Sequence, residues 1–507
     1  METIGHWIGG KPVAGDGRVS PVYNPATGRR TAEVTLATEA EVADAVRVAS
    51  AAATDWSRTS LARRAGLMFR LRELVSGHQS ELAALITREH GKVRSDALGE
   101  VARGLECVEF ACAIPTLLRG EYSAEASRGI DVHTVARPLG VVAGITPFNF
   151  PVMVPLWMLA NAVACGNTFI LKPSEKDPSA SLLLAELVAR AGFPEGVVNV
   201  LQGDAPAVTG LVEHPDVAAV SFVGSTPVAR HIYETGTRAG KRVQALGGAK
   251  NHMVVLPDAD LGAAANAAIN AGYGSAGERC MAISVVVAVG SVADPLVDAI
   301  AARIPDVVIG PGDQETSMMG PLITAEHRDR VRSYVAGAAG EGATVVVDGS
   351  RPPAAVVAPA VVAPGGGDAG GFFLGCSLVD QVRPGMRVYD DEIFGPVLAV
   401  VRVDTYDEAV ALVNANPYGN GVALFTRDGG AARQFQRDIQ VGMVGINVAI
   451  PVPVAWHSFG GWKASLFGDS PIYGPEGIRF YTRPQVVTSR WPDPTPEAID
   501  LGFPMNR

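Results

Sequence analysis

The feature that most constrains the fold of this chain is an alternation of short apolar runs with helical patterns, beginning near residue 139. The apolar runs predict buried strands over 139–145, 168–171, 197–201 and 218–223. Helical patterns over 152–164 and 179–191 lie between the first three. Strands that alternate with helices are typical of a doubly wound parallel sheet. A second alternating region over about 252–447 predicts a second α/β domain, and residues 38–118 are expected to be mostly helical.

Composition narrows the class of protein. The chain has 507 residues, of which 48% are hydrophobic, so large apolar cores can form. A net charge of -10 without a long basic run argues against nucleic acid as a main partner. Five scattered cysteines indicate a reduced compartment rather than a disulfide framework. We expect no membrane partner and no signal peptide, because the run 155–165 is too short to cross a bilayer and the first residues lack a basic start. The predicted location is the cytoplasm, or the mitochondrial matrix if a transit peptide has been removed.

Cys280 is the candidate nucleophile. It lies in the run Gly272-Tyr-Gly-Ser-Ala-Gly-Glu-Arg-Cys-Met281. Gly274 and Gly277 allow close approach of the backbone to a reacting group, and the preceding Arg279 is expected to favour the nucleophilic thiolate. The alternative interpretation is a small buried apolar residue.

Two glycine-containing segments are candidates for phosphate binding. Residues 365–370 match the letters of a dinucleotide fingerprint, but the Pro-rich stretch before them is no central strand and no helix follows, so we expect a flexible surface loop. The better candidate is Phe222-Val-Gly-Ser-Thr-Pro227, where a strand ends and a capped helix begins. An ordinary capped turn is the alternative there.

Several runs together resemble the aldehyde dehydrogenase superfamily. They are Ile145-Thr-Pro-Phe-Asn-Phe-Pro151, Leu171-Lys-Pro-Ser-Glu-Lys176, Phe222-Val-Gly-Ser-Thr226 and Glu392-Ile-Phe-Gly-Pro396. Three further runs resemble its CoA-acylating methylmalonate-semialdehyde dehydrogenases, namely Gly248-Ala-Lys-Asn-His252, Gly277-Glu-Arg-Cys-Met-Ala282 and Asn416-Pro-Tyr-Gly-Asn-Gly-Val-Ala-Leu-Phe-Thr-Arg427.

The resemblance implies an aldehyde dehydrogenase-like α/β fold with two doubly wound domains and a small β oligomerisation extension. It places an NAD-binding domain at 1–121 and 141–246 and a catalytic domain at 247–447. Oligomerisation strands are expected at 122–140 and 484–497. The superfamily is commonly tetrameric, so a homotetramer is expected.

The resemblance also assigns roles to single residues. Cys280 would attack the aldehyde carbon, and Asn149 with the Cys280 N–H would hold the oxyanion. NAD would be bound by Thr146, Phe148, Lys172, Glu175, Lys176, Ser225, Gly247 and Glu392. Alternatives are a plain turn residue for Asn149, an exposed ion pair for Lys172 and Glu175, and solvated loop charge for Glu392. No metal ligand set is expected.

One absence indicates how the acyl group leaves. Hydrolytic members of the superfamily carry a water-activating Glu, and the corresponding run here is Gln244-Ala-Leu-Gly-Gly-Ala-Lys250. Counting back from Cys280 puts Leu246 at that position, and aligning on Leu-Gly-Gly puts Ala245 there. Neither side chain can be a base, so the resemblance implies that coenzyme A, as co-substrate, accepts the acyl group.

The predicted substrate is a small semialdehyde whose acid group needs a cationic partner. We predict a carboxylate clamp formed by Arg103, on a helix that includes 97–118, and Arg279 beside the nucleophile. The alternative is that Arg103 pairs with Glu100 or Glu106, three residues away on the same helix. The expected activity is NAD-dependent, CoA-acylating oxidation of methylmalonate or malonate semialdehyde with decarboxylation. A hydrolytic semialdehyde dehydrogenase and a non-catalytic binding protein on the same fold are the alternatives.

Overall fold

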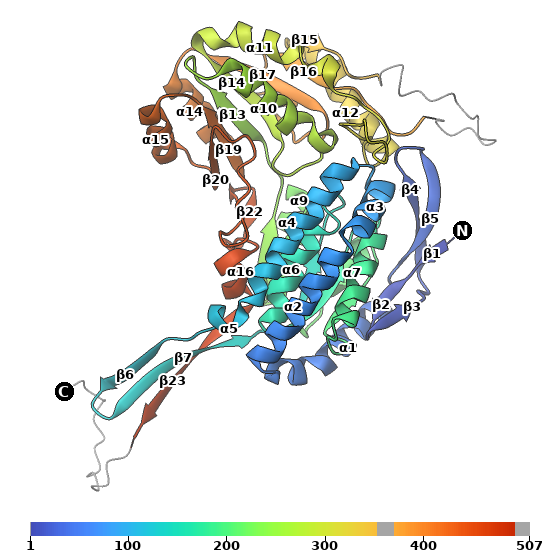
Figure 1. Cartoon of the computed structure of the whole chain (residues 1–507), viewed down its shortest axis with the longest axis vertical. Coiled ribbons are helices and arrows are strands. Elements are labelled where there is room, and N and C mark those ends of the chain that lie inside the picture. The colour runs from blue at the N-terminus through green and yellow to red at the C-terminus, as the bar shows by residue number, and fades with distance from the viewer. Residues whose placement is uncertain (1, 352–369, 492–507) are drawn as a thin grey trace.

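The computed structural model describes residues 2–351 and 370–491 (Figure 1). Two large sheets carry most of the molecule, and a narrow β extension projects from one end. The predicted surface loop at 365–370 lies almost wholly outside the described residues, as does most of the Pro-rich stretch before it. No helix in the described part of the chain is long and apolar enough to cross a membrane.

The first large sheet has the strand order β22-β12-β11-β8-β9-β10-β2-β3. Its five central strands are parallel: β8 (Val141–Ile145), β9 (Thr168–Lys172), β10 (Val198–Val200), β11 (Val217–Val223) and β12 (Arg242–Leu246). Antiparallel strands close both edges: β2 (His6–Ile8), β3 (Lys11–Val13) and β22 (Leu466–Phe467). The four strands predicted from apolar runs are confirmed.

Side chains of this sheet alternate between two apolar cores, as the pleat of a strand requires. On β8, Val142 packs into one core and Ala143 into the other, and on β9 Phe169 and Ile170 divide in the same way. The first core is completed by α2 (Leu61–Gly77), α3 (Gln79–His90), α4 (Arg94–Cys112), α6 (Met153–Ala164) and α7 (Ser179–Arg190). The second is completed by α1 (Glu39–Arg58), α8 (Ala205–Glu213) and α9 (Thr226–Arg238). Both faces of the sheet are therefore covered by helices, as the predicted doubly wound fold requires.

The second large sheet has the order β15-β16-β17-β14-β13-β19-β20. Six strands are parallel: β13 (Asn251–Val255), β14 (Ile283–Val289), β16 (Ser377–Asp380), β17 (Val397–Val403), β19 (Gly421–Phe425) and β20 (Met443–Ile446). The edge strand β15 (Thr344–Val347) is antiparallel. Around it lie α10 (Leu261–Tyr273), α11 (Ala293–Ala301), α12 (Ala325–Ala338), α13 (Arg387–Asp390), α14 (Tyr406–Ala415) and α15 (Gly429–Asp438). This sheet confirms the second α/β domain of the predicted fold class.

The projecting extension is an antiparallel sheet of β6 (Tyr122–Ser127), β7 (Ile130–Pro138) and β23 (Thr482–Arg490), in the order β23-β7-β6 (Figure 1). The predicted segment 122–140 contains β6 and β7, and the predicted segment 484–497 overlaps β23, which begins two residues earlier. Residues 492–497 lie outside the described part of the chain. The remaining elements are β1 (Glu2–Ile4), β4 (Arg18–Asn24), β5 (Arg29–Leu36), β18 (Tyr418–Gly419), β21 (Trp462–Lys463), α5 (Ile114–Leu117) and α16 (Gly474–Phe480). The exact division of the chain into domains stays a prediction.

Candidate active site

Cys280 lies on the loop that joins α10 to β14, between a short 3-10 turn, η1 (Gly274–Gly277), and the start of the strand. Its side chain is half-buried, whereas Cys107, Cys112, Cys165 and Cys376 are buried. The Cys280 carbonyl accepts hydrogen bonds from two side-chain amides, Asn251 Nδ2 at 2.9 Å and Asn420 Nδ2 at 3.0 Å. Neither asparagine was predicted to be a site residue, although both lie in runs that carry the family resemblance.

The turn before Cys280 has an unusual backbone. Ser275 and Ala276 both have φ of +52°, and Gly277 has φ of +75°. A side chain at Gly277 would place its Cβ 2.3 Å from the carbonyl oxygen of Gly395. Glycine is therefore required for the nucleophile loop to approach this neighbouring loop so closely. Left-handed conformations at two non-glycine residues are costly and concentrate at functional sites.

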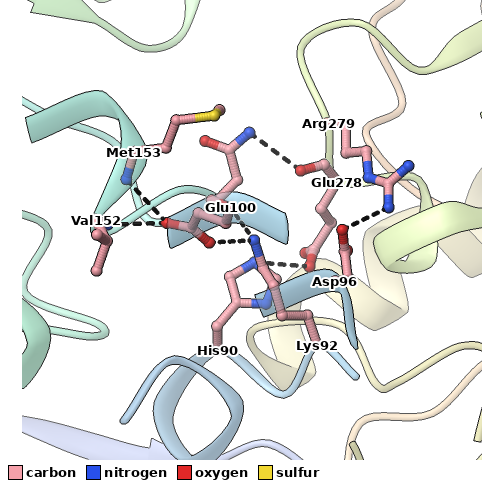
Figure 2. Close-up of polar contacts among 9 residues, drawn as sticks. His90, Lys92, Asp96, Glu100, Val152, Met153, Glu278 and Arg279 are labelled. Carbon is pink, nitrogen blue, oxygen red and sulfur yellow. Dashed lines mark hydrogen bonds and ion pairs between the residues drawn. The ribbon is translucent and has the colours of Figure 1, made fainter. Parts of the chain in front are cut away.

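Arg279, which precedes Cys280 in the chain, forms an ion pair with a carboxylate of another element. Its Nη2 donates to Asp96 Oδ1 at 2.7 Å, at the start of α4 (Figure 2). Burial and, after it, the Glu392 carboxylate raise the pKa of Cys280 to about 12, and Arg279 opposes this shift only weakly. Arg279 thus favours the thiolate, as expected, but desolvation outweighs the effect of a cation that is already paired.

Asn149 lies on the turn between β8 and α6, and its side chain is buried. Its Nδ2 donates to the carbonyl oxygen of Glu278 at 3.1 Å, two residues before Cys280. An amide NH2 group has two N–H donors. One is engaged with Glu278, and the oxyanion role that the family resemblance assigns to the second stays a prediction.

Five of the residues predicted to bind NAD lie just after the ends of β8 and β9 or at them: Thr146, Phe148, Lys172, Glu175 and Lys176. The Thr146 N–H donates to the Lys172 carbonyl at 3.1 Å, and Lys172 Nζ lies 3.6 Å from Glu175 Oε2. Lys176 Nζ lies 4.9 Å from the centre of the Phe148 ring, within the range of a cation–π contact. The ion pair of Lys172 and Glu175 is present, but Lys172 is buried rather than exposed, and burial lowers its pKa.

Ser225, Gly247 and Glu392 lie on three neighbouring segments at the ends of β11 and β12 and after α13. Ser225 is the exposed N-cap residue of α9, although its side chain makes no capping hydrogen bond. A Cβ at Gly247 would lie 2.8 Å from the Ala464 carbonyl oxygen. Glu392 Oε1 accepts from the Ala249 N–H at 2.9 Å, so this carboxylate is held rather than solvated. Glu392 and Cys280 line the same small cavity, and burial raises the pKa of Glu392 to about 7.

Arg103 is engaged by partners within the protein. Its Nη1 donates to both carboxylate oxygens of Glu106, at 2.8 and 2.7 Å, and its Nη2 donates to the Pro453 carbonyl at 2.7 Å. The structure therefore contains the alternative pairing with Glu106. Arg103 and Arg279 share no partner, because Arg279 is paired with Asp96. The carboxylate clamp formed by Arg103 and Arg279 stays a prediction.

The half-buried thiol of Cys280 and the buried amide of Asn149, from the two different α/β sheets, thus come together at the loop of Glu278. The sequence profile of the aldehyde dehydrogenase family matches residues 13–487, and the chain belongs to that family. Malonate-semialdehyde dehydrogenase of Pseudomonas aeruginosa is 52% identical over 506 residues, which cover 99% of this chain and 100% of the relative. Malonate-semialdehyde dehydrogenase 2 of Geobacillus kaustophilus is 47% identical, with coverage of 97% and 99%.

Two solved structures match the whole fold. Methylmalonate-semialdehyde dehydrogenase from Oceanimonas doudoroffii superposes with a TM-score of 0.93 at 51% identity, covering 97% of this chain and 99% of that one. A protein from Sinorhizobium meliloti 1021, solved in complex with NAD, gives the same TM-score, 0.93, at 51% identity and the same coverage, 97% and 99%. These comparisons confirm the predicted family and fold.

Proposed function

We propose that this chain oxidises malonate or methylmalonate semialdehyde with NAD and transfers the acyl product to coenzyme A, with loss of carbon dioxide. The names of the relatives in P. aeruginosa and O. doudoroffii support the substrate class. The observation that carries the acyl-transfer step is the apolar character of the end of β12. Ala245 and Leu246 are both buried there, where a hydrolytic relative would carry its water-activating Glu.

The residues predicted to hold NAD fit such a group. Thr146 Oγ1 is buried and has no hydrogen-bond partner within the described residues, so it can accept or donate to a bound molecule. A Cβ at Gly248 would lie 2.3 Å from Glu392 Oε2, so this glycine backbone forms a tight cradle next to the carboxylate. Lys172 and Glu392 would bind ribose hydroxyls, and the N-terminus of α9 at Ser225 would face the pyrophosphate. When bound, NAD supplies a hydride acceptor.

The chain's own groups prepare the aldehyde for hydride loss. The Cys280 thiol first gives its proton to solvent, because the thiolate is the nucleophile. Sγ then bonds to the aldehyde carbon as the C=O π bond opens and its electrons move to the oxygen. The Asn149 amide and the Cys280 N–H donate to the oxygen that becomes negatively charged, which is worth roughly 3 kcal/mol for each well-placed donor. Loss of hydride from this carbon restores the carbonyl and leaves an acyl group on Sγ as a thioester.

The acyl group is released in two steps, decarboxylation and transfer to the CoA thiol. The substrate carboxylate is β to the thioester carbonyl, so its C–C bond breaks to give carbon dioxide and a carbanion that the carbonyl stabilises and a proton quenches. The CoA thiolate then attacks the thioester, and Cys280 leaves as thiolate. Leu246 provides no base for water, so hydrolysis is slow.

We also propose that the extension takes part in a homotetramer. Tyr122 of β6 and Val486 of β23 are large apolar residues with 64% and 63% of their surface exposed. Exposed strands with apolar side chains favour pairing with another chain. Sedimentation of the protein and of Val486→Asp tests this: the proposal expects a tetramer that the substitution weakens, and a wild-type monomer would refute it.

The decisive experiment measures NADH absorbance and acyl products with malonate semialdehyde, with and without CoA. We expect a burst of one NADH per active Cys280 without CoA, followed by a slow phase, and a strong acceleration with CoA that yields acetyl-CoA. Equal release of free acid without CoA would instead establish the hydrolytic alternative. Absence of NADH under every condition would establish a non-catalytic binding protein.

A further inference from the structure

The most enclosed ion pair near the candidate site joins Lys92 to Glu100. Lys92 Nζ lies 2.7 Å from Glu100 Oε2, and neither side chain has any exposed surface (Figure 2). Lys92 Nζ also lies 4.3 Å from the centre of the Phe150 ring. None of the residues predicted from the sequence to hold substrate or NAD makes this pair, so its function in the fold requires a separate explanation.

The pair holds both ends of one short segment. Lys92 Nζ donates to the main-chain carbonyl of Asn149 at 2.7 Å. Glu100 Oε1 accepts the N–H groups of Val152 at 2.8 Å and Met153 at 3.2 Å, and Figure 2 shows these contacts side by side. Residues 149–153 are thereby fixed between a cation at one end and an anion at the other.

The contact with Glu100 explains how α6 begins. The N-cap residue of this helix, Val152, has no side chain that could accept a hydrogen bond, and none of the usual caps is present. The first N–H groups of a helix need an acceptor and carry a partial positive charge. Glu100, from α4, supplies that acceptor from a different element, so the start of α6 is set by the position of the ion pair.

The same segment carries the predicted oxyanion donor. Asn149 Nδ2 reaches the carbonyl oxygen of Glu278, and Lys92 fixes the main chain of Asn149 from the opposite side. A displacement of 1 Å in such a donor can cost about two orders of magnitude in rate. The ion pair thus lies one hydrogen bond away from the group whose placement the reaction depends on.

We propose that Lys92 and Glu100 are positioning residues that hold the Asn149 amide at the place where the oxyanion forms. The inference rests on the proposed role of Asn149 in the reaction. Stability alone is a poor reason for such a pair, since replacing buried ion pairs by apolar residues of similar size is often neutral or stabilising. The ion pair contacts the main chain of residues 149–153 and not the substrate, so it acts on the reaction only by fixing the position of the Asn149 amide.

A double-mutant cycle separates positioning from general support of the fold. The first arm is Lys92→Met with Glu100→Gln, which removes both charges but keeps an amide oxygen for the N–H groups of Val152 and Met153. The second arm is Asn149→Ala. Single-turnover formation of NADH from a saturating semialdehyde gives the rate, and thermal unfolding and NAD titration give stability and cofactor affinity.

We expect Asn149→Ala to slow the single turnover by about 100- to 1,000-fold, as loss of an oxyanion donor does. The pair variant should slow it roughly 10-fold in the wild-type background and less than about 2-fold in the Asn149→Ala background, because coupled residues are not additive. NAD affinity should change by less than about 2-fold in all variants.

Arg64→Met is the matched control. Arg64 is also a buried cation, and its Nη1 donates to the Ala164 carbonyl at the opposite end of α6 at 2.7 Å. It should lower the unfolding temperature, as the pair variant does, but its small effect on the rate should be the same in both backgrounds.

Each outcome decides a different point. Equal slowing by the pair variant in both backgrounds would overturn the inference and make the pair structural. An Asn149→Ala variant with wild-type rate would instead overturn the proposed oxyanion role. If the pair variant does not fold, Glu100→Gln alone carries the test: smaller slowing that disappears in the Asn149→Ala background supports the inference, and slowing that persists there overturns it.

Discussion

Arg279 donates a hydrogen bond from Nη2 to Asp96 Oδ1 at 2.7 Å, so the cation next to the nucleophile is paired with a carboxylate of α4. The second oxygen of Asp96 is buried and has no hydrogen-bond partner within the described residues. The charge of Arg279 is therefore largely compensated before a substrate arrives. We expect this pair to influence both how the thiol of Cys280 titrates and how a substrate carboxylate binds.

Asp96→Asn should make Cys280 more reactive. The substitution removes a negative charge and releases Arg279, and an uncompensated cation favours the thiolate, so the pKa of Cys280 should fall. We expect iodoacetamide to modify Cys280 about 3- to 10-fold faster at pH 8, measured by mass spectrometry, for a pKa lower by about half a unit or more. Asp294→Asn, which removes an exposed partner of Arg402, is the control and should leave the rate unchanged. A wild-type rate in Asp96→Asn would show that the ion pair does not influence the thiol.

Cys280→Ala should abolish formation of NADH and leave NAD binding intact, because no other thiol lies at the site. Cys107→Ala is the matched control: Cys107 is buried on α4, burial raises the pKa of its thiol, and that variant should keep activity if it folds. NADH absorbance and NAD titration by tryptophan fluorescence measure the two properties. Turnover by Cys280→Ala would assign the nucleophile elsewhere.

Arg103→Leu tests the proposed clamp. Charge-assisted hydrogen bonds to a carboxylate are worth about 1.5–3 kcal/mol, so kcat/KM for malonate semialdehyde should fall roughly 10- to 150-fold. Propanal has no carboxylate and should be much less affected. Glu106→Gln is the control, since it removes the observed partner of Arg103 but keeps the cation. Equal losses for both aldehydes in Arg103→Leu would show that Arg103 supports the fold through Glu106 and the Pro453 carbonyl.

NAD affinity should depend on the ionisation of Glu392. Burial raises the pKa of this carboxyl to about 7, so it is protonated below that pH and becomes a carboxylate above it. A carboxylate is the better acceptor for ribose hydroxyls, so the Kd for NAD should fall as the pH rises from 6 to 8. The glutamine side chain of Glu392→Gln cannot ionise, so the Kd of this variant for NAD should be higher and independent of pH. A wild-type Kd that is constant over this range would remove Glu392 from the cofactor site.

The fold was predictable because its central strands are apolar on both faces. β9 begins at Thr168 and β8 ends at Ile145, where the apolar runs place them. Local patterns also predicted both possible partners of Arg103, since residues three apart on a helix are neighbours. Arg103 pairs with Glu106 because the carboxylate of Glu100 is already bonded to Lys92, on the loop before the helix.

Interactions between distant segments account for most of what sequence patterns did not predict. Asn251, at the start of β13, and Asn420, at the bend between β18 and β19, both reach the Cys280 carbonyl, and no spacing between them indicates this. The raised pKa of Cys280 has a similar origin, because desolvation depends on everything packed around the thiol. A neighbouring Arg is visible in the sequence, whereas its engagement by Asp96, 183 residues away, is not.

Cys280 and Asn149, the proposed nucleophile and oxyanion donor, belong to different halves of the molecule. The Cys280 carbonyl is tied to Asn251 at the start of β13 in the second sheet, whereas Asn149 follows β8 in the first. The proposed reaction centre therefore forms only while the two halves keep their relative positions. The Asn149–Glu278 hydrogen bond is one contact that joins them. Turnover should therefore report whether the two halves are correctly placed. In a urea titration, activity should disappear at a lower concentration than the helical signal measured by circular dichroism.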